Sequence, residues 1–145
     1  MRPILAALAA LALASPAAAW QAGTDGALCT LTHEQAGLDI RLTHDPGPPL
    51  WTITITAPAP WPDAPIFSIA FLGGADLTIS TDRHSLSPDG LSLTVTDRGF
   101  GNVLAGLSGN TTAHFRLGDA EWTASLAGAA PEVAAFAACH STPSV

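Results

Sequence analysis

Apolar and polar residues alternate along most of this chain, and they do so with the period of a β-strand. The alternation covers residues 28–33 (LCTLTH), 37–43 (GLDIRLT) and 50–56 (LWTITIT). Because successive side chains of a strand point to opposite faces, these segments are expected to form antiparallel strands with one buried face. The residues expected to face the core are Cys29, Leu31, Leu38, Ile40, Leu42, Trp51, Ile53 and Ile55.

Residues 57–65 (APAPWPDAP) interrupt this alternation with a proline at every second or third position. Proline cannot donate to a sheet, so this segment is expected to be an extended crossing between two sheets. Its Trp61 has two interpretations, a docking aromatic for a partner or a cap on the core, and the second is commoner in so small a domain. The very apolar residues 66–72 (IFSIAFL) then predict a central strand.

A hairpin is expected around Asp89-Gly90, since glycine supplies the positive φ of a tight turn and aspartate tolerates it. With these two residues at the centre of the turn, Leu86 lies opposite Leu93 and His84 lies opposite Val95. Leu91, Leu93 and Val95 then line one face of the second strand, and Ser92, Thr94 and Thr96 line the other.

The strand that leads into this hairpin changes phase. Leu77 and Ile79 are apolar at odd positions, whereas Leu86 is apolar at an even one, so a bulge or break is expected between Thr81 and Ser85. Such a break re-aims side chains at an active site, or it bends a strand around a sandwich. The structural interpretation is favoured.

A second hairpin is expected between residues 110–117 and 120–126, with Gly118-Asp119 in a type II′ turn. This register places Phe115 opposite Trp122 and Ala113 opposite Ala124. Residues 131–139 predict a short helix that buries Val133 and Phe136. A weak repeat of residues 93–107 in residues 122–136 extends the same expectation, a short helix, to residues 99–107.

Residues 1–19 are expected to be a signal peptide, with Arg2, an apolar stretch and an Ala-x-Ala cleavage site before Trp20. A single β-rich domain, residues 20–145, would then be exported to the periplasm or to the extracellular space. Cys29 and Cys139 lie near its two ends, and in an oxidising compartment they are expected to form one disulfide. Reduced thiols, a metal pair and an intermolecular bridge are the alternatives.

The fold expected from these elements is a mainly antiparallel β-sandwich or a partly closed barrel of about eight or nine strands. One or two short helices complete it, and the disulfide staples the C-terminal helix to the first strand. After cleavage four arginines and no lysine face twelve carboxylates, a net charge of −8. This charge disfavours nucleic acid and anionic lipid as partners, and no integral membrane segment is expected after cleavage.

The candidate site is the end of the first hairpin, where charged and polar residues gather. It comprises Asp82, Arg83, His84, Asp97, Arg98 and Asn102. These side chains can bind a carboxylate or phosphate, and His84 with Asp82 or Asp97 can perform acid–base chemistry. Cross-strand salt bridges at a solvated sheet end account for the same residues without a ligand, and this interpretation is favoured.

Other chemistry has little support in the sequence. The five histidines (33, 44, 84, 114 and 140) are not spaced as metal ligands, so neither a metal nor another cofactor is expected. Ser108 lies outside a G-x-S-x-G motif, and Gly99-Phe100-Gly101 lacks the lysine of a phosphate-binding loop.

Several stretches resemble a group of exported alphaproteobacterial proteins whose activity is not characterised. They are CTLTHE (29–34), WPDAP (61–65), STDRH (80–84), LSLTVTDRGFGNVLAGL (91–107) and LAGAAPEVAAFAAC (126–139). Some members of the group carry the name of the excinuclease ABC, a DNA-repair enzyme. No DNA-repair activity is expected, because this short, acidic chain has neither a Walker A motif nor room for helicase domains. A fainter likeness links it to the invasion-associated locus B proteins.

The sequence therefore favours a non-enzymatic exported protein, either an envelope accessory or a module that binds a small molecule or a protein in the periplasm. The alternative is a small periplasmic hydrolase or lyase that uses His84 with Asp82 or Asp97.

Overall fold

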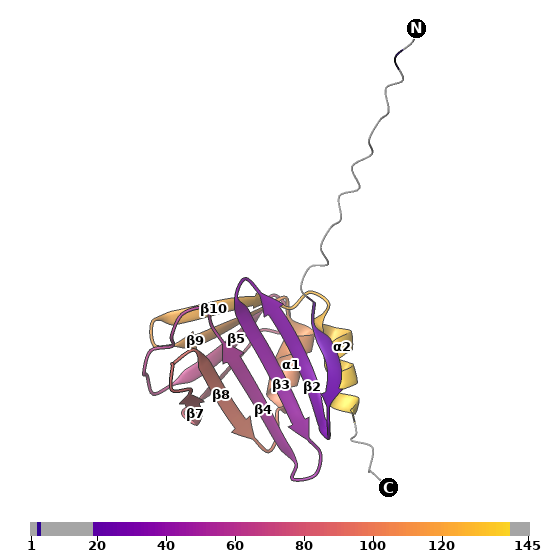
Figure 1. Cartoon of the computed structure of the whole chain (residues 1–145), viewed down its shortest axis with the longest axis horizontal. Helices are drawn as coiled ribbons and strands as arrows, with labels where there is room; N and C mark the ends of the chain where they lie inside the picture. Colours follow the sequence, from indigo (N-terminus) through magenta and orange to yellow (C-terminus); the bar gives the residue numbers. More distant parts are fainter. Residues whose placement is uncertain (1–2, 4–18, 140–145) are drawn as a thin grey trace.

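The computed structural model describes residue 3 and residues 19–139 of the chain. Most of the predicted signal peptide, and His140 with the residues after it, lie outside this part. The described residues form two antiparallel sheets and two helices (Figure 1). The sheets do not close into a barrel, so the sandwich is the predicted architecture that forms.

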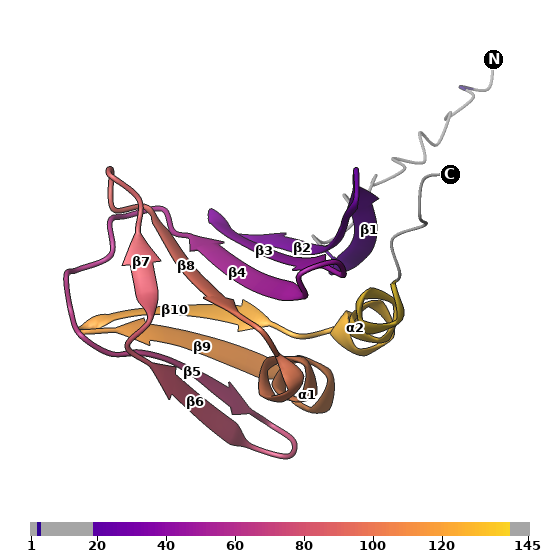
Figure 2. The same ribbon diagram turned by 90° about the horizontal axis from the view of Figure 1, so that it is seen from below.

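The larger sheet has the strand order β1-β2-β3-β4-β8-β7 and the smaller sheet the order β10-β9-β5-β6. The strands of the larger sheet are β1 (Gln21–Asp25), β2 (Leu28–Gln35), β3 (Leu38–Asp45), β4 (Leu50–Thr56), β7 (His84–Leu86) and β8 (Ser92–Asp97). Those of the smaller sheet are β5 (Phe67–Leu72), β6 (Leu77–Thr81), β9 (Thr112–Leu117) and β10 (Ala120–Ser125). The helices are α1 (Gly101–Gly109) and α2 (Ala129–Ala138), which lie at the same side of the sandwich (Figure 2).

The core lies between the sheets and consists of the residues that the alternation assigns to it. All the residues expected to face the core on β2, β3 and β4 are buried except Trp51, which is half-buried. Both hairpins have the expected register, with Leu86 opposite Leu93 and Phe115 opposite Trp122. The central position of β5 is also confirmed.

Trp61 caps the core, as the favoured interpretation expects. Its side chain is only 4% exposed, and its indole N–H donates to the carbonyl of Ile55. Its ring meets Phe67 edge-on at 6.3 Å between centroids. The proline-rich segment around it carries the chain from β4 in the larger sheet to β5 in the smaller one, which confirms the predicted crossing.

The phase change between Thr81 and Ser85 is a change of sheet. β6 pairs with β5 in the smaller sheet and buries the face of Ile79, whereas β7 pairs with β8 in the larger sheet and turns His84 and Leu86 inward. Figure 2 shows β7 crossing the space between the two sheets. The predicted break therefore has the structural role, because it lets one segment serve both faces of the core.

β1 is a strand that the alternation did not predict. Its residues are mostly exposed, and it forms because its backbone pairs with β2 from Gln21↔Thr32 to Asp25↔Leu28. Trp20 anchors its start: the ring is buried, stacks on His33 at 4.5 Å and donates its N–H to the carbonyl of Ser125.

The predicted disulfide and both predicted helices are present. Cys29 of β2 is joined to Cys139 directly after α2, with 6.0 Å between their Cα atoms. α2 buries Val133 and Phe136 as expected. In α1 the buried residues are Val103, Gly106 and Leu107, and no helix in the described part of the chain is long and apolar enough to span a membrane.

We predict that Gly106→Ala destabilises the protein by about 1–3 kcal/mol, because a Cβ at this position would overlap the ring of Phe71 and would push α1 away from β5. The matched control is Gly101→Ala in the same helix, where a Cβ has no neighbour within 4 Å. This control is expected to change the free energy of unfolding by less than about 0.5 kcal/mol. Urea denaturation of both variants measures the difference, and equal midpoints would contradict the close approach of α1 to β5.

We also predict a pH dependence of the first hairpin. The hydroxyl of Ser87 and the backbone N–H of Leu91 donate to Asp89, which lowers the pKa of this carboxyl below 3.8. The ionised form therefore favours the folded turn above that pH, and its contribution is lost as the pH falls through the lowered pKa. Carboxyl chemical shifts followed by NMR should give Asp89 a midpoint below 3.8, and Ser87→Ala should move that midpoint upward.

Candidate functional site

A cavity of about 430 Å³ opens between the two sheets, beside β6, the end of β8 and the start of α1. Ile53, Phe67, Ile69, Ile79, Val95, Phe100 and Val103 form its apolar wall, and Ser80, Thr81, Asp97, Gly99, Gly101 and Asn102 complete the lining. The wall comes from strands of both sheets, so the space is the part of the sandwich interior that side chains leave unfilled. It exists where the chain changes sheet after β6.

The start of α1 contributes backbone N–H groups to this lining. The first hydrogen bond of the helix runs from the N–H of Leu104 to the carbonyl of Phe100, so the N–H groups of Gly101, Asn102 and Val103 precede the helical ladder. Phe100 occupies the N-cap position and offers no capping side chain, and the first turn holds no acidic residue. These N–H groups carry the positive end of the helix dipole toward this side of the cavity.

Asp97 is the charged residue of the lining, and it lies between two arginines in sequence and in space. Its Oδ1 accepts the backbone N–H of Arg98 at 2.7 Å, and its Oδ2 lies 3.9 Å from a guanidinium nitrogen of Arg83. The side chains of Arg83 and Asp97 are 72% and 43% exposed, so this ion pair contributes little to stability. Its importance is positional, because it places both signs of charge at the mouth of the cavity.

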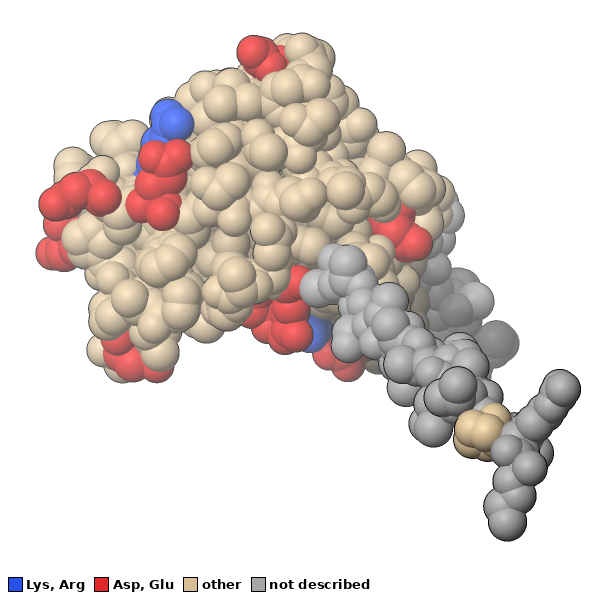
Figure 3. Space-filling model, turned by 90° about the horizontal axis from the view of Figure 1, so that it is seen from above, with Lys and Arg blue, Asp and Glu red and all other residues tan. Residues whose placement is uncertain are grey.

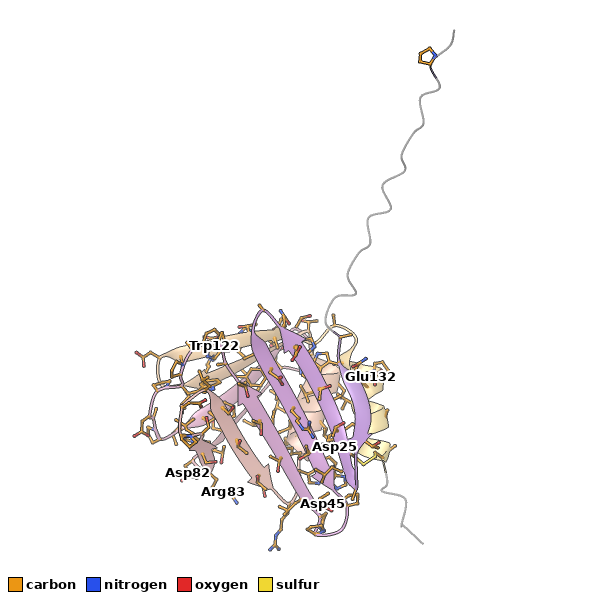
Figure 4. The ribbon with its side chains drawn as sticks, in the orientation of Figure 1. Asp25, Asp45, Asp82, Arg83, Trp122 and Glu132 are labelled. Atoms are coloured by element: carbon orange, nitrogen blue, oxygen red, sulfur yellow. A yellow bond between two sulfur atoms is a disulfide. The ribbon has the colours of Figure 1, made fainter. Side chains whose placement is uncertain are left out.

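The other predicted site residues divide into two groups. Asn102 lines the cavity with Asp97, whereas Asp82 and Arg98 are exposed and do not line it. Figure 4 places Asp82 and Arg83 at the margin of the molecule, next to β7. The structure thus brings Asp97 and Asn102 to one space with Arg83 at its edge, and leaves Asp82 outside.

His84 is held by the fold and has no hydrogen bond to either aspartate. Its Nε2 lies 3.0 Å from the carbonyl oxygen of Ala64, and its ring lies 6.4 Å from that of Phe67. Its Nδ1 is buried and has no hydrogen-bond partner. The hydrolase or lyase hypothesis requires His84 to bond Asp82 or Asp97, and the described geometry provides neither bond.

The remaining described histidines serve separate parts of the fold. His33 stacks on Trp20, His44 stacks on Trp51 at 3.7 Å, and His114 contacts Glu121 at 2.9 Å on the outer face of the smaller sheet. Within residues 19–139, no three histidine, cysteine, aspartate or glutamate side chains are grouped closely enough to hold a metal ion.

Sequence reasoning missed the apolar wall and the helix end. The wall draws on β4, β5, β6 and β8, which meet only through the sheet pairing, so no local pattern identifies it. One signal was available for the helix end: Gly99-Phe100-Gly101 starts a predicted helix without a capping side chain.

Comparison with known proteins gives no relative: no family model matches the chain, and no curated protein or solved structure is significantly similar to it. The functional argument therefore rests on the cavity and its surroundings.

We predict that His84→Ala destabilises the protein by about 1–2 kcal/mol, because it removes the bond to the carbonyl of Ala64 and a contact near Phe67. The neighbouring control Arg83→Ala removes an exposed side chain and should change the free energy of unfolding by less than about 0.5 kcal/mol. Thermal and urea denaturation of the two variants checks this. An unchanged His84→Ala would show that the ring is not part of the fold.

Proposed function

We propose that this chain is an exported, non-enzymatic binding protein of the periplasm, and that it holds a small apolar molecule with a neutral polar head between its two sheets. The observation that carries the proposal is the cavity, with its apolar wall and its mouth of mixed charge. Its volume of about 430 Å³ lies within the range of about 300–1,000 Å³ that is common for ligand pockets.

The wall sets the chemistry of the buried part of the ligand. Its apolar side chains offer no hydrogen-bonding group, so a polar group placed against them would lose its hydration without compensation. An aliphatic chain or a small ring system fits this wall, because its transfer from water is favourable in proportion to its apolar area.

The mouth sets the chemistry of the head. The carboxylate of Asp97 repels an anionic head, and the N–H groups at the start of α1 together with Arg83 disfavour a cationic one. A hydroxyl or an amide both donates and accepts, so it can bond Asp97 and the helix N–H groups together. A neutral head is therefore the one that this mouth favours.

Two features support the assignment to the periplasm. The first nineteen residues have the charge, apolar stretch and cleavage site of a signal peptide, and the Cys29–Cys139 disulfide is typical of an oxidising compartment. Figure 3 shows carboxylates spread around the margin of one face with few arginines among them. A protein with this surface is not suited to a polyanionic partner.

We predict that the neutral fluorescent probe N-phenyl-1-naphthylamine binds the protein and that Val95→Phe weakens its binding by about tenfold or more, since the larger ring occupies the cavity. The control is Thr94→Phe, the adjacent residue on the outer face of β8, which should leave the affinity unchanged. Fluorescence titration measures both. Circular dichroism must first show that both variants are folded, and equal affinities in folded variants would refute the cavity as the site.

A matched series of ligands tests the head. Octanol and octanamide should displace the probe at lower concentration than octanoate or octylamine, which share the chain and differ in charge. Asp97→Asn should remove part of the discrimination against octanoate, because it removes the negative charge at the mouth. Equal displacement by all four compounds would contradict the proposed role of the mouth.

A further inference from the structure

The two sheets present four edge strands, β1, β7, β6 and β10. An edge strand exposes unpaired backbone N–H and C=O groups, and natural proteins guard such edges with charges, prolines, short strands or covering elements. The four edges of this protein differ in how they are guarded.

Three of them are guarded. At β1 the backbone N–H of Ala22 donates to the Glu132 carboxylate of α2, and Figure 4 shows Glu132 beside this strand. β7 is only three residues long. β10 contains Glu121, and its Ser125 donates its N–H to Gln35 and accepts the indole N–H of Trp20.

β6 has none of these devices. Its five residues, Leu-Thr-Ile-Ser-Thr, contain no charge and no proline, and they include the β-branched residues that favour strands. Within the described residues β5 is its single strand partner, so the opposite edge is open. Figure 2 shows β6 as the strand of the smaller sheet that lies farthest from the larger sheet.

We propose that β6 is a docking edge to which an extended segment of a partner protein adds as an antiparallel strand. This inference does not depend on the proposed ligand of the cavity. The edge supplies the backbone groups, and the alternating side chains of Leu77, Ile79 and Thr81 on one face and Thr78 and Ser80 on the other favour a partner with a β-branched centre.

Charge defines the ends of the partner segment. Asp76 and Asp82 flank β6 directly and are exposed, so the edge is a neutral strand between two carboxylates. A seven-residue antiparallel segment with a basic residue at each end would place a positive charge opposite each aspartate.

The same arrangement disfavours a second copy of this chain as the occupant. If two copies of β6 paired about a two-fold axis through Ile79, Asp76 of one copy would lie opposite Asp82 of the other, at both ends of the pair. Like charges directly opposite each other on paired strands are destabilising. The edge therefore selects a basic partner segment over itself.

The test uses a blocked peptide, arginine–valine–threonine–valine–threonine–valine–arginine, added to the oxidised protein. Amide hydrogen exchange of residues 77–81 should slow when the peptide binds, because their open backbone groups become paired. A peptide with proline at the central position cannot donate there, and one with glutamates in place of the arginines meets Asp76 and Asp82. Each should bind about tenfold more weakly or worse.

Variants of the protein give a second, independent readout. Asp82→Asn and Asp76→Asn should each weaken the arginine peptide about twofold to fivefold and reduce the effect of salt. Thr78→Lys places a positive charge on the edge and should weaken binding, whereas Thr123→Lys, on the outer face of β10, should not.

Three outcomes would overturn the proposal: exchange protection outside β6, equal binding of the proline peptide, or a dimer in sedimentation that Asp76→Asn strengthens. The last would make a second copy the occupant. The naphthylamine probe reports on the cavity and hydrogen exchange reports on the edge, so failure of one site is distinguishable from failure of the other.

Discussion

The fold depends on the fixed side-chain period of a β-strand. One strand cannot turn Leu77 and Ile79 inward together with Leu86, because odd and even positions point to opposite faces. The chain satisfies both requirements by leaving the smaller sheet after Thr81 and joining the larger sheet at His84. A bulge within a single sheet would have changed the phase as well. The change of sheet additionally links the two layers, and it leaves β6 at the margin of its sheet.

The cavity follows from this change of sheet. β7 covers only the first part of β8, from Leu93 to Val95, so the end of β8 at Asp97 has no neighbour on that side. α1 approaches from the other direction and is held against β5 by the contact between Gly106 and Phe71. The space enclosed between them is apolar because every strand turns its core face toward it, and its mouth is polar because a strand end and a helix start meet there.

The sequence predicted the parts of this architecture that local patterns determine. Alternation located the buried residues of β2, β3 and β4, and glycine at the turns set the registers of both hairpins. β1 was missed because tertiary contacts, namely pairing with β2 and the anchoring of Trp20, hold residues that have no alternation of their own. The internal repeat predicted the helix at α1 but matched Leu104 to the buried Val133, whereas Val103 and Leu107 are the buried residues.

The same limit explains the candidate site. Sequence proximity grouped six polar residues around the hairpin, and the structure gathers two of them, Asp97 and Asn102, into the cavity lining. His84 was misjudged as an accessible group because its neighbour in space, the carbonyl of Ala64, belongs to the proline-rich crossing and is twenty residues away. A site assembled from two sheets and a helix start depends on the pairing of strands far apart in sequence, and no motif encodes that pairing.

Stability and function occupy opposite sides of this molecule. The disulfide between residues 110 positions apart, the buried Trp20 and the bond from Ala22 to Glu132 all tie β1, β2 and α2 together. Closing a loop of that length contributes on the order of 4–5 kcal/mol in the chain-entropy model, a large part of the stability of a small domain. An unfilled cavity lowers stability, because the atoms that line it lose packing partners. The covalent link therefore offsets a weakness at the β6 side, and it does so without occupying the cavity or covering the open edge.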